Sequence, residues 1–422
     1  MVACSSVNVE TGNSTSTDSI DEGVDPVATI KAPENNREDK EPASQDNIDA
    51  RENIILDTSD KTGEKESTND STKEEQADIS LEGIFTHTPL LIEDIAEIVT
   101  LGNLNPPSHV FPTDHIYFYG LRKDGADHPE IANLFAPGDL PIKEIRASEH
   151  VNAGFRDYSI YFQPGKEVTI YFGHVSSLSE EIFGNTSSLE GWTMQNEYST
   201  GGEIYRQWRK ECDISIPAGQ ILGTAGGNKG QWALDLGVYD SRLTQENVAN
   251  AERWRQSQYL HAVDPLSLMI ESLLEEMIPL VKRDMGKGER PPFGSILQDI
   301  PGTAQGCWFL SGINETYPED NHLALVHSNI HPAMSVISAG SSISTLKSRT
   351  YEFIPEQTGL LNRDFSGITP DGNIYGFQTE NHQQTIIMNM PDNDTLWLET
   401  LPRLTLNTDD WVFSGNKNVF NR

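Results

Sequence analysis

Long apolar runs and positive charge are both scarce in this chain of 422 residues. No stretch of 18 or more consecutive apolar residues occurs, so we expect no helix that spans a membrane. Only 30 Lys and Arg stand against 64 Asp and Glu, which leaves a net charge of −34. Because phosphate backbones are bound by clustered cations, this balance excludes a nucleic-acid partner. The length allows two or three domains.

Cysteine is also rare, with three residues in the whole chain: Cys4, Cys212 and Cys307. None of them lies in a Cys-x-x-Cys or Cys/His spacing, so the sequence carries no zinc-finger signal. Cys212 and Cys307 could form a disulfide or remain buried thiols. We expect thiols, because nothing in the sequence brings their Cα atoms within bonding range.

The first 80 residues lack aromatic side chains altogether. They contain 18 Ser and Thr, and 20 acidic against 7 basic residues leave them a net charge of −13. Such a segment buries too little apolar surface to offset its chain entropy. We therefore predict that residues 1–80 form a disordered, acidic, Ser/Thr-rich tether and that the folded part begins near Leu81.

Residues 1–6, Met-Val-Ala-Cys-Ser-Ser, resemble the end of a bacterial lipoprotein signal, in which a small residue precedes the lipidated cysteine. The resemblance implies that Cys4 carries lipid, that this anchor is the only link to a membrane, and that the protein is extracellular or lies on the cell envelope. The charged start and apolar core of a signal peptide are missing before Cys4. A cytoplasmic chain with an acidic tail therefore stays open as the alternative.

Hydrophobic patterning divides the rest of the chain into three parts. Residues 81–240 carry alternating Tyr, Ile, Phe and Val between glycines, which predicts a β domain. The polar stretch 176–211 inside it looks like an insertion that could form a lid. Residues 241–300 predict a helical connector, with its longest helix over Asp264–Asp284, because Asp and Pro suit a helix start. Residues 301–422 hold short, evenly spaced apolar segments, typical of a small antiparallel β sandwich or barrel.

Four short motifs follow one another along the first β region. They are Pro-Thr-Asp-His-Ile-Tyr-Phe-Tyr (112–119), Val-Thr-Ile-Tyr-Phe-Gly-His-Val-Ser (168–176), Ile-Pro-Ala-Gly-Gln-Ile-Leu-Gly-Thr-Ala-Gly-Gly (216–227) and Trp-Ala-Leu-Asp-Leu-Gly-Val-Tyr (232–239). Their order and character resemble the core of a lysostaphin-type zinc peptidoglycan endopeptidase, a fold also called the duplicated hybrid motif. The resemblance implies that residues 81–240 form a β domain like that of these peptidases.

In that family, His-x-x-x-Asp on the first strand supplies two zinc ligands and Tyr-x-His on the middle strand a catalytic histidine. His-x-His on a later strand supplies another catalytic histidine and the third ligand. By this resemblance His115 is the first ligand and His174 the middle histidine, although its spacing here is Tyr-x-x-His. Tyr119 replaces the aspartate, and Ala233-Leu-Asp235 replaces His-x-His. Two of three ligand positions are altered, which implies a degenerate metal site.

Aspartate can bind zinc, so His115, His174 and Asp235 could still form a metal site with two histidines and one carboxylate. Such a site would turn His174 from a base into a ligand. The carboxylates that could then serve as the base are Asp114, Glu144 and Asp240. Without a metal, the two histidines and Asp235 would be ordinary hydrogen-bonded residues of a β scaffold.

The altered ligands favour a cell-envelope or secreted protein that has lost zinc peptidase activity, needs no cofactor, and acts in binding or assembly. The resemblance implies as its partner a cell-wall glycan, a cell-wall peptide or another envelope protein. The alternative is an active metal-dependent cell-wall hydrolase, with zinc held by His115, His174 and Asp235.

Overall fold

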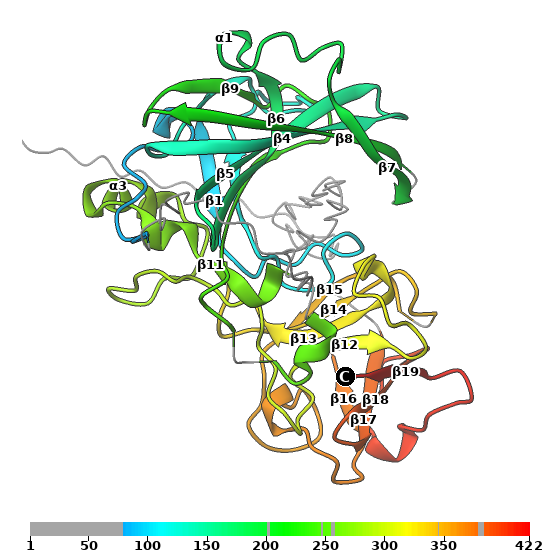
Figure 1. The fold of residues 1–422 in the computed structure, drawn as a ribbon. Coiled ribbons are helices and arrows are strands. Elements are labelled where there is room, and N and C mark those ends of the chain that lie inside the picture. The colour runs from blue at the N-terminus through cyan, green and yellow to red at the C-terminus, as the bar shows by residue number, and fades with distance from the viewer. Residues whose placement is uncertain (1–78, 201–202, 246–247, 255–257, 345, 379–383) are drawn as a thin grey trace, which may run out of the picture. The chain divides into compact units, whose positions relative to one another are not determined.

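The structure is a computed structural model that describes residues 79–422 except 201–202, 246–247, 255–257, 345 and 379–383 (Figure 1). The predicted tether lies outside the described residues, except for its last two residues. The lipidation site predicted at Cys4 lies outside them as well. Within them the protein is mainly β and contains two antiparallel sheets, as the sequence predicts. None of the helices in this part of the chain is long and apolar enough to cross a membrane.

The first sheet has eleven strands, and a continuous path runs through it in the order β1-β2-β10-β6-β5-β4-β8-β7. Their bounds are β1 (Ile95–Val99), β2 (Ile116–Gly120), β4 (Leu140–His150), β5 (Phe155–Gly165), β6 (Val168–Leu178), β7 (Thr193–Thr200), β8 (Glu203–Ile216) and β10 (Ala233–Asp240). β3 (Ala132–Phe135) pairs with β9 (Ile221–Ala225), which also pairs with β6, and β11 (Ala262–Val263) pairs with β10. Because β10 lies between β2 and β6, three of the four sequence motifs meet on neighbouring strands.

The polar stretch 176–211 is not an inserted lid, contrary to expectation. Its second half forms β7 and β8, which extend the first sheet beyond β4, and α1 (Glu180–Phe183) with the loop up to residue 192 precedes them. The stretch is polar because charged side chains pair across the strands: Arg209 Nε lies 2.5 Å from Glu144 Oε2, and Arg206 Nε lies 2.7 Å from Glu197 Oε2. Cross-strand ion pairs of this kind stabilise exposed strands that lack apolar alternation.

Short helices make up the connector between the sheets. They are α2 (Ala251–Trp254), η2 (Gln258–His261), η3 (Pro265–Leu268), α3 (Glu271–Met277) and η4 (Ile278–Leu280), and a further turn, η1 (Ile92–Asp94), precedes β1. Asp264 caps η3 and accepts a hydrogen bond from the Leu266 amide at 2.9 Å, with Pro265 in the first turn. The predicted helix start is therefore confirmed.

The continuous helix predicted over Asp264–Asp284 is wrong, because the chain leaves helical geometry at Ile270, whose ψ is 149°. Backbone hydrogen bonds to Phe85 explain the break. The Phe85 amide donates to Leu268 O at 3.0 Å, and the Ile270 amide donates to Phe85 O at 2.9 Å. A neighbouring segment thus replaces the hydrogen bonds that a helix would have made within itself.

The second sheet has eight strands in the order β15-β14-β13-β12-β19-β18-β17-β16. Their bounds are β12 (Gly306–Leu310), β13 (Leu323–His327), β14 (Ser335–Ala339), β15 (Arg349–Phe353), β16 (Tyr375–Phe377), β17 (Thr385–Asp392), β18 (Thr395–Leu401) and β19 (Asn418–Asn421), with the turns η5 (Glu319–Asn321), η6 (Phe365–Gly367) and η7 (Thr408–Asp410) between them. Side chains from its two edge strands meet in one core, since the rings of Phe353 and Phe377 lie 5.1 Å apart. The predicted small antiparallel sandwich or barrel is confirmed.

Both cysteines of the described chain are free thiols, as expected. Cys212 lies on β8 and is half-buried, whereas Cys307 lies on β12 and is 1 % exposed. Burial raises the pKa of both thiols, that of Cys307 far above its usual value. Cys307 therefore behaves as a small core residue rather than as a nucleophile.

Candidate functional site

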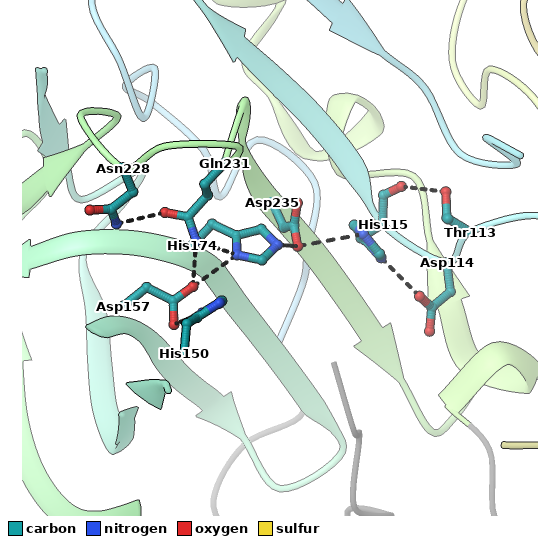
Figure 2. Close-up of polar contacts among 9 residues, drawn as sticks. All are labelled: Thr113, Asp114, His115, His150, Asp157, His174, Asn228, Gln231 and Asp235. Carbon is teal, nitrogen blue, oxygen red and sulfur yellow. Dashed lines mark hydrogen bonds and ion pairs between the residues drawn. The ribbon is translucent and has the colours of Figure 1, made fainter. Parts of the chain in front are cut away.

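His115, Asp235 and His174 come from three neighbouring strands of the first sheet (Figure 2). Asp235 on β10 lies opposite Tyr117 of β2 and Gly173 of β6. His115 immediately precedes β2 and His174 follows Gly173, so both imidazoles reach the same carboxylate. His115 Nε2 lies 3.6 Å and His174 Nε2 lies 3.4 Å from Asp235 Oδ2. The structure thus brings the three residues singled out by the sequence together through Asp235.

A β-bulge in β6 turns His174 toward the site. The spacing Tyr-x-x-His would place Tyr171 and His174 on opposite faces of a regular strand. The register between β5 and β6 shifts at this point, and His174 has a φ of 60°, in the left-handed region that non-glycine residues rarely adopt. The bulge absorbs the additional residue. His174 therefore shares the face of Tyr171, whose ring lies 6.1 Å from that of His115.

Two glycines leave the space that the site needs. A Cβ on Gly173 would lie 2.9 Å from Asp235 Oδ2 and 3.2 Å from Asp235 Cβ. A Cβ on Gly237 would lie 2.1 Å from the ring of Tyr171. Any larger residue at position 173 would press on the carboxylate that joins the two imidazoles.

Each imidazole is held on its far side by a further carboxylate. His115 Nδ1 lies 3.1 Å from Asp114 Oδ1, and His174 Nδ1 lies 2.9 Å from Asp157 Oδ2. The other oxygen of Asp157 lies 3.2 Å from His150 Nε2. Carboxylates and imidazoles therefore alternate along one line of six side chains. We call it the Asp/His chain: Asp114, His115, Asp235, His174, Asp157 and His150.

The Asp/His chain is shielded from solvent along its whole length. His174 is its most exposed member at 9 %, and none of the others exceeds 4 %. Neutral side chains complete its surroundings. The Gln231 amide donates to Asp157 Oδ2 at 2.5 Å, and the Tyr239 hydroxyl donates to Asp114 Oδ2 at 3.3 Å. Buried charges of this kind are stable only when they are paired and hydrogen-bonded.

The tautomers of His115 and His174 decide whether their contacts with Asp235 are attractive. If His115 and His174 donate their Nδ1 protons to Asp114 and Asp157, a neutral ring turns the lone pair of its Nε2 toward Asp235 Oδ2. A lone pair that faces a carboxylate is unfavourable. The contact becomes attractive when the imidazole carries a second proton or when a cation lies between the two groups.

Asp157 shows how strongly the pairing acts. Burial by itself raises the pKa of this carboxyl, but the charges and hydrogen bonds of His150 and His174 outweigh burial and hold the pKa well below the usual 3.8. Asp157 therefore stays ionised between its two imidazoles.

The donor set of two nitrogens and one oxygen suits zinc, but its arrangement fits zinc only in part. Ligand atoms 2.0–2.1 Å from a tetrahedral zinc lie about 3.3–3.4 Å apart, and the two imidazole-to-carboxylate distances of 3.6 and 3.4 Å are close to this. Figure 2 shows the Asp235 carboxylate between the two rings, with each ring turned toward it. Among the residues that the structure describes, no group of three or more His, Cys, Asp and Glu side chains is arranged to hold a metal ion.

The two altered motif positions lie beside the Asp/His chain. Tyr119 of β2 and Ala233 of β10 are direct cross-strand partners, and they pack with Val99 and Tyr117 in a small apolar cluster. In the family that the motifs resemble, these two positions carry a zinc ligand and a catalytic histidine, and here an apolar contact takes their place. Tyr117 of the same cluster lies directly opposite Asp235.

Of the three carboxylates considered as a substitute base, only Asp114 belongs to the site. Glu144 is held by Arg146 Nε at 2.6 Å and by Arg209 Nε at 2.5 Å. Asp240 forms an ion pair with Arg242 at 2.7 Å, and hydrogen bonds from Arg242 lower the pKa of Asp240. Glu144 and Asp240 are therefore structural ion-pair partners.

Sequence reasoning missed His150, Asp157 and Gln231. The one signal for Asp157 is an ionisable residue inside a strand of aromatic and aliphatic side chains, whereas His150 and Gln231 carry no motif. The comparisons with known proteins add nothing that would identify them: no protein-family model matches the chain, and no curated protein or solved structure is significantly similar to it.

Proposed function

We propose that the chain is a cell-envelope or secreted protein whose first sheet is a peptidase-like scaffold without zinc peptidase activity, and that it works in binding or assembly. The observation that carries this proposal is the position of Asp235. Its carboxylate lies against both imidazoles, and His115, Asp235 and His174 are 1 %, 2 % and 9 % exposed. A hydrolytic zinc site needs an open coordination position for water and room for the amide beside it.

The altered motif positions support the same proposal. Tyr119 and Ala233 pack against one another, so the side chains needed for a second ligand and a catalytic histidine are replaced by an apolar contact. With His174 held by Asp157 at 2.9 Å, the Asp/His chain resembles a buried ion-pair network that fixes three strands to one another. The partner proposed is a cell-wall glycan or peptide, or another envelope protein.

Two measurements on the full chain test this proposal. The chain is incubated with cross-linked peptidoglycan fragments, with and without added zinc, and products are analysed by mass spectrometry. Co-sedimentation with insoluble cell wall measures binding. We expect no cleavage, and binding that survives His115→Ala in a variant that still unfolds cooperatively. Cleavage that depends on zinc and is lost in His115→Ala overturns the proposal, and so does the absence of binding to cell wall and to envelope proteins.

One observation favours an active metal-dependent hydrolase as the second candidate. Both imidazoles turn Nε2 toward Asp235 and are held through Nδ1 by a second carboxylate, which is how metal-binding histidines are usually oriented. A zinc ion held by His115, His174 and Asp235 would supply a Lewis acid and an activated water. Asp114 and Asp157 would fix the tautomers of the two rings.

Zinc binding itself separates the two candidates. Elemental analysis of the purified chain, followed by zinc titration in a calorimeter, is compared for the wild type and Asp235→Asn. Stoichiometric zinc that Asp235→Asn loses supports the hydrolase. The hydrolase is rejected if the purified protein contains no metal and its melting temperature is the same in added zinc and in chelator.

A further inference from the structure

A second group of chemically active side chains lies on the other face of the first sheet. Asp157 of the Asp/His chain and Tyr158 are consecutive in β5, so their side chains point to opposite faces. Ala147 of β4 lies opposite Tyr158, and Trp208 of β8 lies opposite Ala147. Tyr158 and Trp208 therefore share the face that Asp157 does not use, and the small Ala147 leaves space between them.

Two indoles and two cations meet on this face. Arg156 Cζ lies 5.7 Å from the centroid of Trp208, and Lys210 Nζ lies 6.0 Å from that of Trp192. The ring of Trp192 is also 6.4 Å from that of Tyr158. We call Trp192, Trp208, Arg156 and Lys210 the tryptophan–cation cluster.

The two cations stand out in a chain with twice as many acids as bases. Within the described part of the chain, neither Arg156 nor Lys210 forms an ion pair with a carboxylate, and Arg156 Nη1 donates instead to Ser187 O at 3.1 Å. Glu149 lies opposite Arg156 in the register but pairs with Arg206 at 3.5 Å. The positive charge of the cluster is therefore not neutralised by the residues around it.

Two nitrogen donors of the cluster have no acceptor. Trp192 Nε1 and Arg156 Nε are buried and lack a hydrogen-bond partner among the described residues. Buried donors are nearly always satisfied in native proteins, because leaving one unpaired forfeits its hydration without compensation. One of these donors belongs to Arg156 itself, and the charges of Arg156 and Lys210 are uncompensated. Together they point to an anionic acceptor that comes from outside the chain.

The loop that covers the cluster is strained. Leu189 has a φ of 52°, which is unfavourable for a residue with a branched side chain, and its carbonyl accepts the Trp192 amide at 3.1 Å. Ser187 of the same loop contacts Arg156. Gly184 and Gly191 near the ends of the loop have open space around them, with φ of 69° and 78°. Movement of this loop would release Arg156 from Ser187 O and displace Trp192 at its end.

We infer that the tryptophan–cation cluster binds an acidic sugar, that is, a pyranose ring carrying a carboxylate. The apolar face of the ring would stack on an indole, while the carboxylate accepts from Trp192 Nε1, Arg156 Nε and the Lys210 ammonium group. This inference names the ligand class of the proposed binding function and rests on that function. It needs neither the Asp/His chain nor a metal.

Calorimetric titration of the full chain with matched sugars tests the inference. N-acetylmuramic acid and N-acetylglucosamine differ by one carboxylate-bearing substituent, and glucuronic acid carries its carboxylate on the ring. We expect saturable binding of an acidic sugar and binding of N-acetylglucosamine that is about tenfold weaker or absent, as for the loss of one charged hydrogen bond. Preference for muramic or for glucuronic acid distinguishes a cell-wall amino sugar from a uronic acid polymer.

Three variants localise the binding. The double variant Arg156→Gln/Lys210→Gln removes the charge, and Trp192→Phe removes one N–H donor but keeps a ring. We expect each to weaken binding about tenfold. The matched control is Lys417→Gln, because Lys417 Nζ lies 4.4 Å over Trp397 in the second sheet and should not contribute. Melting temperatures confirm that all variants are folded.

The inference is overturned if acidic and neutral sugars bind equally well or if neither binds. It is also overturned if the cluster variants keep the affinity of the wild type. The proposed function then still stands if the chain sediments with cell wall. Cleavage of peptidoglycan fragments would overturn the proposed function instead, whatever the sugars do.

Discussion

The two sheets of this protein bury different chemistry. The first buries the six ionisable side chains of the Asp/His chain, all at 9 % exposure or less. The second packs aromatic rings against one another, as where Phe353, Phe365 and Phe377 meet at 5.1–5.6 Å. A charged interior is held together by particular partners, and its stability depends on protonation. An apolar interior is stabilised by close packing and by the apolar surface area it buries, and its stability barely responds to pH.

Two buried aspartates outside the second sheet repeat the contrast. Burial raises the pKa of both Asp157 and Asp264. At Asp157, two histidines reverse the effect and the pKa falls. At Asp264, the amides of Phe293 and Leu266 do not suffice, and the pKa rises to about 6. The number of cationic partners, rather than depth of burial, decides the direction.

Asp157→Ala should have the largest effect. It leaves His150 and His174 without the carboxylate between them, and breaking a buried ion pair costs about 3–5 kcal/mol of unfolding free energy. Because the folded pKa of Asp157 is lowered, its contribution is present above the unfolded value of 3.8 and lost as the pH falls through and below it. Urea unfolding at pH 7 and pH 3 measures both effects.

We expect the gap in unfolding free energy between the wild type and Asp157→Ala to be smaller at pH 3 than at pH 7, because pH 3 lies below the unfolded pKa of 3.8. Asp157→Asn, which keeps the shape and one acceptor, is the control and should lose less. If the difference in unfolding free energy is equal at both pH values, Asp157 acts by packing alone. The first sheet would then not differ from the second in its dependence on protonation.

Gly173→Ala should destabilise the protein by about 1–3 kcal/mol, as is usual for overpacking. The new methyl group would approach Asp235 Oδ2 to 2.9 Å and displace the carboxylate from the two imidazoles. Gly415→Ala is the control, because a Cβ there meets nothing within 4 Å. Equal melting temperatures for the two variants would contradict the tight approach of Asp235 to β6.

Asp264→Asn tests the aspartate that has no cationic contact partner. Its raised pKa means that the folded state binds more protons than the unfolded state between pH 3.8 and about 6, so the wild type loses stability as the pH rises through this window. Relative to Asp264→Asn, which does not titrate, the wild type should gain about 1–1.5 kcal/mol between pH 7 and pH 5. Guanidinium unfolding at both pH values gives the difference, and a change of opposite sign would refute it.

Ile337→Val in the second sheet should have the smallest effect. Ile337 is 0 % exposed, and the loss of one methylene costs about 0.5–1.5 kcal/mol. The loss should be the same at pH 4, 5 and 7, because the side chains that pack with Ile337 in its core cluster are hydrophobic. A loss that varied with pH would mean that the second core is coupled to titrating groups after all.

Much of the second sheet could be predicted from the sequence. Apolar segments at Gly306–Leu310 and Leu323–His327 match β12 and β13 residue for residue. β14 and β19 were missed. β14 carries small residues such as Ser335 and Ser338 that are buried on both faces, and its sequence therefore shows no alternation.

The site was harder to predict than the sheets. His115, His174 and Asp235 were singled out by resemblance, and the structure places them in contact through Asp235. That a metal or a cell-wall partner binds here remains a prediction. His150 and Asp157 escaped notice because the pairing of β4 with β5 and of β5 with β6 brings them to the site, and no local spacing records that pairing.

The sequence by itself determined the β character of both sheets and the helix cap at Asp264, because these depend on residue type and local order. It also shows Tyr119 and Ala233 where the resembled motifs carry aspartate and histidine. Only the tertiary structure decided what His174 does. Its face is set by a bulge and by the register of β6 with β5 and β10, and a shift of one residue would turn it away from Asp235. Register depends on strands far apart in the chain, and so no local pattern can fix it.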